Sequence, residues 1–230
     1  MTYTDNLESA PIWRKWCAIS TISALLERKV YVTTSSPLYP NLYIFVVGDA
    51  GLGKTRPIMA AKNIIKEIPE HIKFAPTSVT MASLTDAMVD ASRKIVRLPH
   101  SMLEYNSIYI MADELSAFMH EYAGDLVAGL TTFYDCIPYS QSRRVRNIDI
   151  KIEAPQLNIL CGTTPSNLIK FVPENAWEQG LMSRVILIFS EERPIIDVFN
   201  TPKKEKPDDL IHDLRIINSM HCEFGWDQDY

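Results

Sequence analysis

Four runs of nearly uninterrupted apolar residues occur along the chain, and each has the length of one β-strand. They lie at 42–47, 107–112, 157–161 and 185–189. Such runs are typical of parallel strands that are buried on both faces of a sheet. The stretches between them, including 55–68 and 82–94, have the periodicity of helices. This alternation predicts an α/β fold with a mainly parallel central sheet flanked by helices.

Both ends of the chain carry helical patterns. Residues 9–29 predict an amphipathic helix with Ser9 as its cap, and residues 208–220 predict another after a charged, proline-containing linker. We expect the first helix to pack on the body of the protein through Ile12, Trp16, Ile19, Ile22 and Leu26. The expected organisation is an N-terminal helical segment, an α/β core, and a C-terminal linker with one helix, at 1–40, 41–190 and 191–230.

Shorter patterns complete the predicted set of elements. Charged and apolar residues alternate over 141–153, which predicts a β-ribbon. Residues 30–34 and 78–81 predict two short strands. Residues 165–182 have the pattern of several helical pieces, and residues 224–227 indicate the start of a further helix.

A glycine-rich loop directly follows the first apolar run. Its residues are Gly48, Asp49, Ala50, Gly51, Leu52, Gly53, Lys54 and Thr55. They match the phosphate-loop pattern G-x-x-x-x-G-K-[ST], between a predicted strand and a predicted helix. Glycines let backbone N–H groups approach phosphate oxygens, and the helix N-terminus adds partial positive charge. Lys54 is expected to reach the β- and γ-phosphates of ATP, and the Thr55 hydroxyl to ligate Mg²⁺.

Two carboxylates stand at the C-terminal end of the second run. Asp113 is placed to hold Mg²⁺ through water, and Glu114 to polarise the attacking water as a general base. On its own, Asp-Glu after a strand is also consistent with a solvated loop or a helix cap. Together with the glycine-rich loop it predicts an ATP-hydrolysing site. The strand-and-helix segment between the two motifs indicates a sheet with an additional strand between the two motif strands.

Composition narrows the classes of function. The 230 residues include 23 Lys+Arg and 28 Asp+Glu, so the formal net charge is −5, which argues against a protein that coats nucleic acid by bulk charge. The longest apolar run is far too short to span a membrane, and the N-terminus has no secretory pattern. The four cysteines are scattered and the five histidines form no ligand pair. We expect a cytoplasmic protein with reduced thiols.

The order of these motifs resembles that of the AAA+ ATPases and the related helicase domains of phages and plasmids. The matching segments, in order, are 48–55, 108–114, the polar strand end Thr163-Thr164, and 180–184. The last of these, followed by an apolar strand, is similar to the arginine-finger segment of minichromosome-maintenance helicases. The wider pattern over 42–190 also resembles a family of primase- or helicase-associated ATPases in phages and mobile elements.

The resemblance implies roles for three more residues. Thr163 or Thr164 matches sensor 1, whose side chain orients the attacking water or binds the γ-phosphate; the family often has Asn here, so both threonines are candidates. Arg184 matches the arginine finger, which stabilises charge on a phosphoryl group in a neighbouring subunit and so implies a ring, expected to be a hexamer. Without the resemblance, Thr163 and Thr164 are also consistent with a turn at the strand end before Pro165. Arg184 is also consistent with a structural ion pair.

One concentrated basic patch lies in the predicted ribbon. It contains Arg143, Arg144 and Arg146, with Tyr139 before it and Lys151 beyond. In ring helicases, which the chain resembles, a hairpin in this region can grip the nucleic-acid backbone. The arginines would then give salt-dependent, sequence-independent affinity, and Tyr139 would stack on a base. The alternatives are a solvated ribbon edge and contact with a neighbouring subunit's nucleotide.

Together these features predict an oligomeric P-loop motor that uses ATP and Mg²⁺ and acts on nucleic acid, as a helicase or translocase in phage or mobile-element DNA replication. The expected partners are single-stranded or forked DNA and replication proteins. We expect no interaction with a membrane. One alternative is an ATP-dependent switch or helicase loader without translocation. Another is a small-molecule kinase, which leaves Glu114 and Arg184 unexplained. The segment after residue 190 is short for the helical lid of AAA+ relatives, so we expect a partial lid, or a piece of a longer protein.

Overall fold

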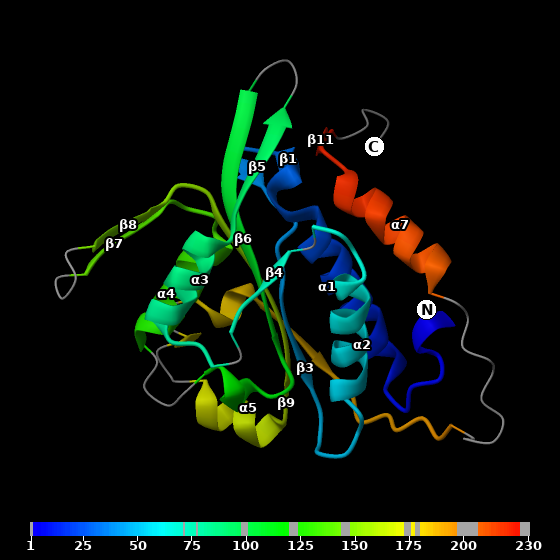
Figure 1. Cartoon of the computed structure of the whole chain (residues 1–230). Helices are drawn as coiled ribbons and strands as arrows, with labels where there is room; N and C mark the ends of the chain where they lie inside the picture. Colours follow the sequence, from blue (N-terminus) through cyan, green and yellow to red (C-terminus); the bar gives the residue numbers. More distant parts are fainter. Residues whose placement is uncertain are drawn as a thin grey trace.

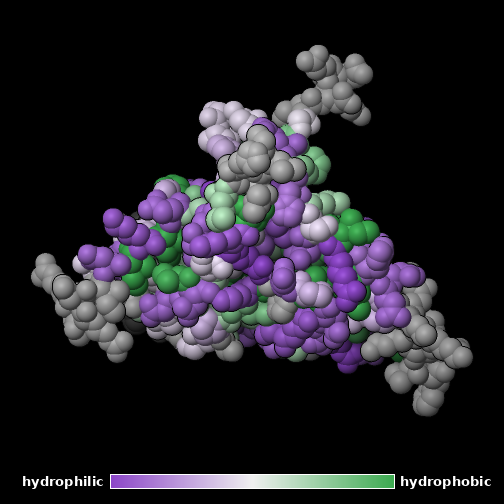
Figure 2. Space-filling model, turned by 45° about the horizontal axis from the view of Figure 1, so that its top comes forward, coloured by the Kyte–Doolittle hydropathy of each residue, from purple (hydrophilic) through white to green (hydrophobic). Residues whose placement is uncertain are grey.

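The computed structural model has the predicted α/β architecture, with a central, mainly parallel sheet and helices on both faces (Figure 1). The residues that it describes are 2–70, 72–76, 78–97, 101–119, 124–143, 148–172, 176–177, 180–196 and 207–225. No helix within these ranges is long and apolar enough to cross a membrane. Hydrophilic residues dominate the face in Figure 2, and apolar residues form small separate patches there.

The central sheet has six strands within the described part of the chain, in the order β10-β3-β9-β6-β4, with β5 paired to the N-terminal half of β6. The strands are β3 (Tyr43–Val47), β4 (Lys73–Phe74), β5 (Ser92–Arg97), β6 (Ser101–Ala112), β9 (Pro155–Thr163) and β10 (Val185–Phe189). Neighbours are parallel except for β5 and β6. Every residue of β3 and β9 is buried, as their apolar runs predict.

Helices cover the two faces of this sheet in separate groups (Figure 1). One group comprises α1 (Pro11–Leu26), α2 (Thr55–Lys66) and α7 (Asp208–Ser219), and the other α3 (Met81–Asp90) and α4 (Gly124–Tyr134). Alternate residues of a strand point to opposite faces, so Phe45 enters the core beneath α3 and α4, and Ile44 enters the core beneath α1, α2 and α7. The short helix α5 (Pro165–Phe171) directly follows β9.

Smaller elements surround this body. A second sheet, ordered β11-β1-β2, pairs the C-terminal strand β11 (Cys222–Phe224) with β1 (Val30–Thr33), and β1 with β2 (Pro37–Leu38). The ribbon predicted over 141–153 is present as the antiparallel hairpin of β7 (Tyr139–Arg143) and β8 (Ile148–Ile152), which projects from the body (Figure 1). The 3-10 turns are η1 (Thr2–Thr4), η2 (Glu27–Lys29), η3 (Leu115–Ala117) and η4 (Met182–Arg184).

The predicted buried face of α1 is wrong. Three of the expected contact residues, Ile12, Ile19 and Ile22, are 38%, 42% and 39% exposed. The buried positions of the helix are instead Trp13, Cys17, Ser20, Thr21, Ser23, Ala24 and Leu25. Ser9 does not cap the helix either, because α1 starts after Ala10 without a side-chain cap.

Polar residues occupy the buried face of α1 because they find hydrogen-bond partners there. The Ser20 hydroxyl bonds the Tyr109 hydroxyl at 2.6 Å, and the Ser23 hydroxyl donates to Asn158 Oδ1 at 2.7 Å. A buried hydroxyl with a partner avoids most of the desolvation penalty. A pattern that counts only apolar residues therefore selects the wrong side of this helix.

Two further predicted elements are also wrong, and one predicted helix is present but shorter. Residues 78–80 form no strand; Thr80 caps α3, and Ser83 completes a capping box with it. The helix predicted over 82–94 ends at Asp90, because the next residues form β5 against β6. At the C-terminus, β11 takes the place of the helix start predicted at 224–227, as far as residue 225 is described.

A buried carboxylate connects the end of α1 to the β5–β6 hairpin. Glu27 is 1% exposed; it accepts a hydrogen bond from the Tyr105 hydroxyl at 2.7 Å and lies 3.0 Å from Arg93 Nε. Lys29 Nζ lies 3.5 Å from the same carboxylate and donates to the Asn218 carbonyl at 2.6 Å. Burial lowers the pKa of Lys29, although Glu27 opposes this shift. The network therefore joins α1, the hairpin and the end of α7.

Leu25 and Ile19 offer a matched test of how α1 packs. Leu25 is fully buried, whereas Ile19 is 42% exposed. Leu25→Ala should lower the free energy of unfolding by about 2–5 kcal/mol because it leaves a cavity, and Ile19→Ala by only about 0.5 kcal/mol. Urea unfolding followed by circular dichroism measures both losses. Equal losses would contradict the buried face described above.

Candidate functional site

Three strand ends meet at one edge of the central sheet. Val47 of β3 pairs with Thr163 of β9, and Ala112 of β6 pairs with Cys161 of the same strand. Parallel strands end at a common edge, so the glycine-rich loop after β3 and the acidic pair after β6 lie on the same side, with the end of β9 between them (Figure 1). The sheet thus has an additional strand between the two motif strands, as predicted.

The glycine-rich loop turns sharply from β3 into α2. Gly51 and Gly53 have φ angles of 83° and 79°, in the region that favours glycine. The helix α2 begins at Thr55, and no described side chain caps its N-terminus. In its first turn the Arg56 N–H donates to the Gly53 carbonyl at 3.2 Å and Pro57 has no N–H, so fewer than four N–H groups of the helix start are available to a ligand. A buried strand, a glycine turn and an uncapped helix N-terminus together form an anion-binding arrangement.

Lys54 folds back over this loop. Its Nζ donates to the carbonyl oxygens of Gly48 and Asp49, at 2.7 Å each, and the residue is 7% exposed. Burial lowers the pKa of the Lys54 ammonium, while the nearby carboxylates of Glu114 and Asp49 act to raise it. Lys54 follows β3 and Glu114 follows β6, so both stand at the same end of the sheet.

The N-terminal segment supports the loop from behind. A Cβ on Gly48 would lie 2.6 Å from the Trp13 ring, whose Nε1 donates to the Ile188 carbonyl at 3.0 Å. A Cβ on Gly53 would overlap the Glu8 carbonyl oxygen. Packing therefore requires both glycines, and at Gly53 the φ of 79° favours glycine as well. No local pattern in the sequence signals the contacts of Glu8 and Trp13 with the loop.

The acidic pair follows β6 at the expected place. Asp113 is exposed and Glu114 is half-buried, and Asn167 Nδ2 donates to Glu114 Oε1 at 3.2 Å. In the described ranges, no group of three or more His, Cys, Asp or Glu side chains is arranged to hold a metal ion. Mg²⁺ commonly binds through one or two protein oxygens and substrate phosphates. Thr55 and Asp113 fit that mode of binding.

The two candidate threonines differ in their surroundings. Thr163 is fully buried, and its carbonyl accepts the Gly48 N–H at 3.2 Å. Thr164 caps α5, because its hydroxyl oxygen accepts the Asn167 N–H at 3.2 Å. Asn167 was not among the predicted site residues. The cap pattern Thr-Pro-Ser-Asn places Asn167 at the third helical position, but no local pattern signals its contact with Glu114, which is 53 residues away in the chain.

Arg184 forms an ion pair within its own chain, which is the structural alternative to the arginine-finger role. Its Nε and Nη2 donate to the two carboxylate oxygens of Asp135 at 2.9 and 2.7 Å, and its Nη1 donates to the Gly180 carbonyl at 2.8 Å. The bonds to Asp135 raise the pKa of Arg184. Val185, the next residue, pairs with Tyr43 at the end of β3 remote from the loop. At about 3.3 Å per residue, Arg184 is roughly 15 Å from the loop of its own chain.

The predicted basic patch belongs, in the sequence, to the last residue of β7 and the segment that joins β7 to β8. Arg144 and Arg146 lie outside the described residues, and so does the side chain of Arg143. The hairpin points away from the sheet (Figure 1). Tyr139 packs against the Phe133 ring with a centroid distance of 5.2 Å, so it belongs to the hairpin base. Stacking of Tyr139 on a base would require it to leave this contact.

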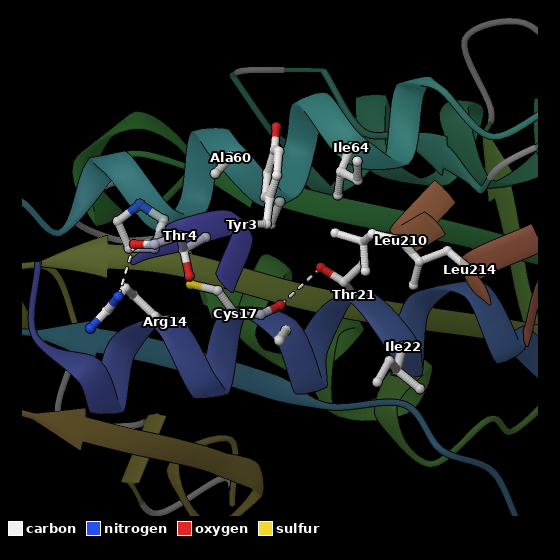
Figure 3. A pocket seen from close by; sticks show the side chains of 13 residues that line it. Tyr3, Thr4, Arg14, Cys17, Thr21, Ile22, Ala60, Ile64, Leu210 and Leu214 are labelled. Carbon is white, nitrogen blue, oxygen red and sulfur yellow. Dashed lines mark hydrogen bonds between the residues drawn. The ribbon is translucent and has the colours of Figure 1, made fainter. Parts of the chain in front are cut away.

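An apolar cavity of about 130 Å³ lies between α1 and α2 (Figure 3). Tyr3 of η1 reaches into the space between the two helices, and Leu210 and Leu214 of α7 close one end. Pro57 lies on its wall, two residues beyond Thr55. The cavity therefore begins within one helical turn of the glycine-rich loop and depends on both ends of the chain.

The arrangement combines an anion-binding loop, a buried ammonium and two carboxylates at one sheet edge. These are the groups that phosphoryl transfer to water requires. The chain matches no protein-family model and no curated protein sequence. The functional assignment therefore rests on the residues and the geometry described above.

Gly51 and Gly53 allow a matched test of how the loop packs. Both have positive φ, but a Cβ on Gly51 would meet nothing within 4 Å, whereas one on Gly53 would overlap Glu8. Gly51→Ala should lower the free energy of unfolding by about 1–2 kcal/mol through backbone strain alone, and Gly53→Ala by clearly more. Thermal unfolding measures the difference. Equal losses would show that the Glu8 contact does not restrict the loop.

Proposed function

We propose that the protein is an ATP-hydrolysing P-loop domain of AAA+ type, which assembles into a ring and acts on nucleic acid. The observation that carries the proposal is the strand order β3-β9-β6. Through this order the loop at 48–54 and the Asp113-Glu114 pair share one sheet edge. The sharp glycine turn at Gly51 and Gly53, directly before α2, is further support.

Each residue of the site has a role in the proposed hydrolysis. The loop N–H groups and Lys54 would bind the β- and γ-phosphates of ATP, with Lys54 exchanging its bonds to loop carbonyls for phosphate oxygens. Thr55 and Asp113 would hold Mg²⁺, which neutralises phosphate charge when bound. Glu114 would accept a proton from the water that attacks the γ-phosphorus, so that ATP and water give ADP and phosphate.

Two further positions complete the proposed site. Thr163 or Thr164, at the end of β9, would sense the γ-phosphate; β9 lies between β3, which leads into the loop, and β6, which leads to Asp113. Arg184 is too far from the loop of its own chain to contact the phosphates bound there. It would act on the nucleotide of a neighbouring copy and would exchange Asp135 for a phosphate oxygen. This distance is the support for assembly into a ring.

Lys54→Ala should reduce Mg²⁺-dependent ATP hydrolysis by about 100-fold or more, because it removes the buried positive charge that binds the phosphates. Lys66→Ala is the matched control, because Lys66 lies exposed in the last turn of the same helix; it should keep the wild-type rate. Release of inorganic phosphate measures the rates, with circular dichroism as a check on folding. Wild-type hydrolysis by the Lys54→Ala protein would refute the enzymatic proposal.

The β7–β8 hairpin is the proposed contact for nucleic acid. Its tip sequence contains Arg143, Arg144 and Arg146, and the hairpin projects from the body on the side away from α1 and α7 (Figure 1). Basic residues in the sequence that joins two projecting strands are suited to sequence-independent contact with phosphates. Movement of this hairpin during hydrolysis would make the protein a helicase or translocase, whereas a hairpin that does not respond would fit an ATP-dependent switch.

Single-stranded DNA should stimulate ATP hydrolysis, and the variant Arg143→Ala/Arg144→Ala/Arg146→Ala should lose this stimulation while it keeps the basal rate. The control Lys15→Ala/Lys66→Ala/Arg215→Ala makes the same change of charge at exposed positions on α1, α2 and α7, and it should remain stimulated. DNA affinity of the wild type should fall with rising salt. If DNA does not stimulate hydrolysis by the wild-type protein, the result favours the ATP-dependent switch over the helicase or translocase.

A further inference from the structure

We propose that Asn167 is a positioning residue, which holds the Glu114 carboxylate in the orientation that activates water; this inference rests on the proposed ATPase function. Asn167 Nδ2 donates to Glu114 Oε1 at 3.2 Å. Within the described ranges this is the one side-chain hydrogen bond that Glu114 makes. The two residues are 53 positions apart in the chain, and the pairing of β6 with β9 brings them together.

Asn167 is itself held in place by the start of α5. Thr164 caps this helix by accepting the Asn167 N–H at 3.2 Å, and its carbonyl accepts the Leu168 N–H at 2.9 Å. Pro165 fixes the first helical position. The preceding residue, Thr163, accepts a hydrogen bond from Gly48. The backbone that leads to Asn167 is therefore hydrogen-bonded to the glycine-rich loop.

Glu114 is anchored through its backbone on the opposite side. Its carbonyl accepts the Ala117 N–H at 3.0 Å, where η3 begins. The next residue, Leu115, is fully buried, and α5 packs against η3. The main chain at Glu114 is therefore fixed, and the side chain is the part that needs a partner to select one rotamer. Asn167 supplies this partner.

A single bond to a neutral amide suits a general base. A carboxylate has two oxygens, and Asn167 occupies Oε1, so Oε2 is left to accept a proton from water. The amide brings no positive charge, so it orients the carboxylate without the loss of basicity that a Lys or Arg would cause. A misplacement of about 1 Å in an active site can cost on the order of 10²-fold in rate. Holding Glu114 therefore affects the chemical step rather than ATP binding.

Four variants of the full chain test this role through steady-state ATP hydrolysis with Mg²⁺ and equilibrium binding of ATP. Asn167→Ala should lower kcat by about 10–100-fold and leave KM and the Kd for ATP unchanged. Asn167→Asp keeps the size of the side chain but places a second carboxylate against Glu114, so kcat should fall at least as far. Asn167→Gln keeps an amide donor and should retain a higher kcat than the alanine variant. Ile169→Ala, at a position of the same helix that is 82% exposed, should match the wild type.

Several results would overturn the positioning role. An Asn167→Ala protein with wild-type kcat would show that Glu114 needs no partner, and one with a raised kcat would show that the contact restrains it. A parallel loss of ATP binding and kcat in both Asn167→Ala and Asn167→Asp would show a purely structural role. A wild-type protein that binds ATP without hydrolysing it is a different failure, because it refutes the proposed function and the role of Asn167 with it.

Discussion

The pairing of β9 with β3 on one edge and with β6 on the other is the interaction on which the site depends. All nine residues of β9 are buried, and the backbone groups of a buried strand must be paired on both sides. This requirement fixes the registers that join Val47 to Thr163 and Ala112 to Cys161. A slip of one residue would turn every side chain of a strand to the opposite face. Asp113 and the glycine-rich loop keep their relation through these two registers.

The ends of the chain also belong to this unit. Trp13 packs against the first residue of the loop, and Glu8 packs against Gly53. The helices α1 and α7 share one hydrophobic core with α2 and β3, and Lys29 joins the end of α7 to Glu27. The segments predicted at 1–40 and 191–230 therefore contribute residues to the same core as the sheet. In the described residues, α7 lies along α1 and α2 (Figure 1).

Features with a local signal could be predicted from the sequence, and features that depend on distant contacts could not. The buried strands and the glycine-rich loop each lie within about ten consecutive residues, so their apolar runs and glycines were sufficient. The face of α1 was not predictable, because its buried hydroxyls need Tyr109 and Asn158 as partners. The strand β5 was missed because it forms only against the long β6. Asn167 was missed because its contact with Glu114 spans 53 residues.

The ion pair of Arg184 and its proposed action on a neighbouring copy are compatible. The side chains of Arg184 and Asp135 are 26% and 32% exposed, so a phosphate from outside can approach the guanidinium. The guanidinium can then exchange Asp135 for a phosphate, since both acceptors fit its planar fork. Until then the two bonds to Asp135 hold the guanidinium at the surface in one orientation. A long side chain that is already ordered loses less entropy when it binds a phosphate, so the ion pair prepares Arg184 for the proposed contact.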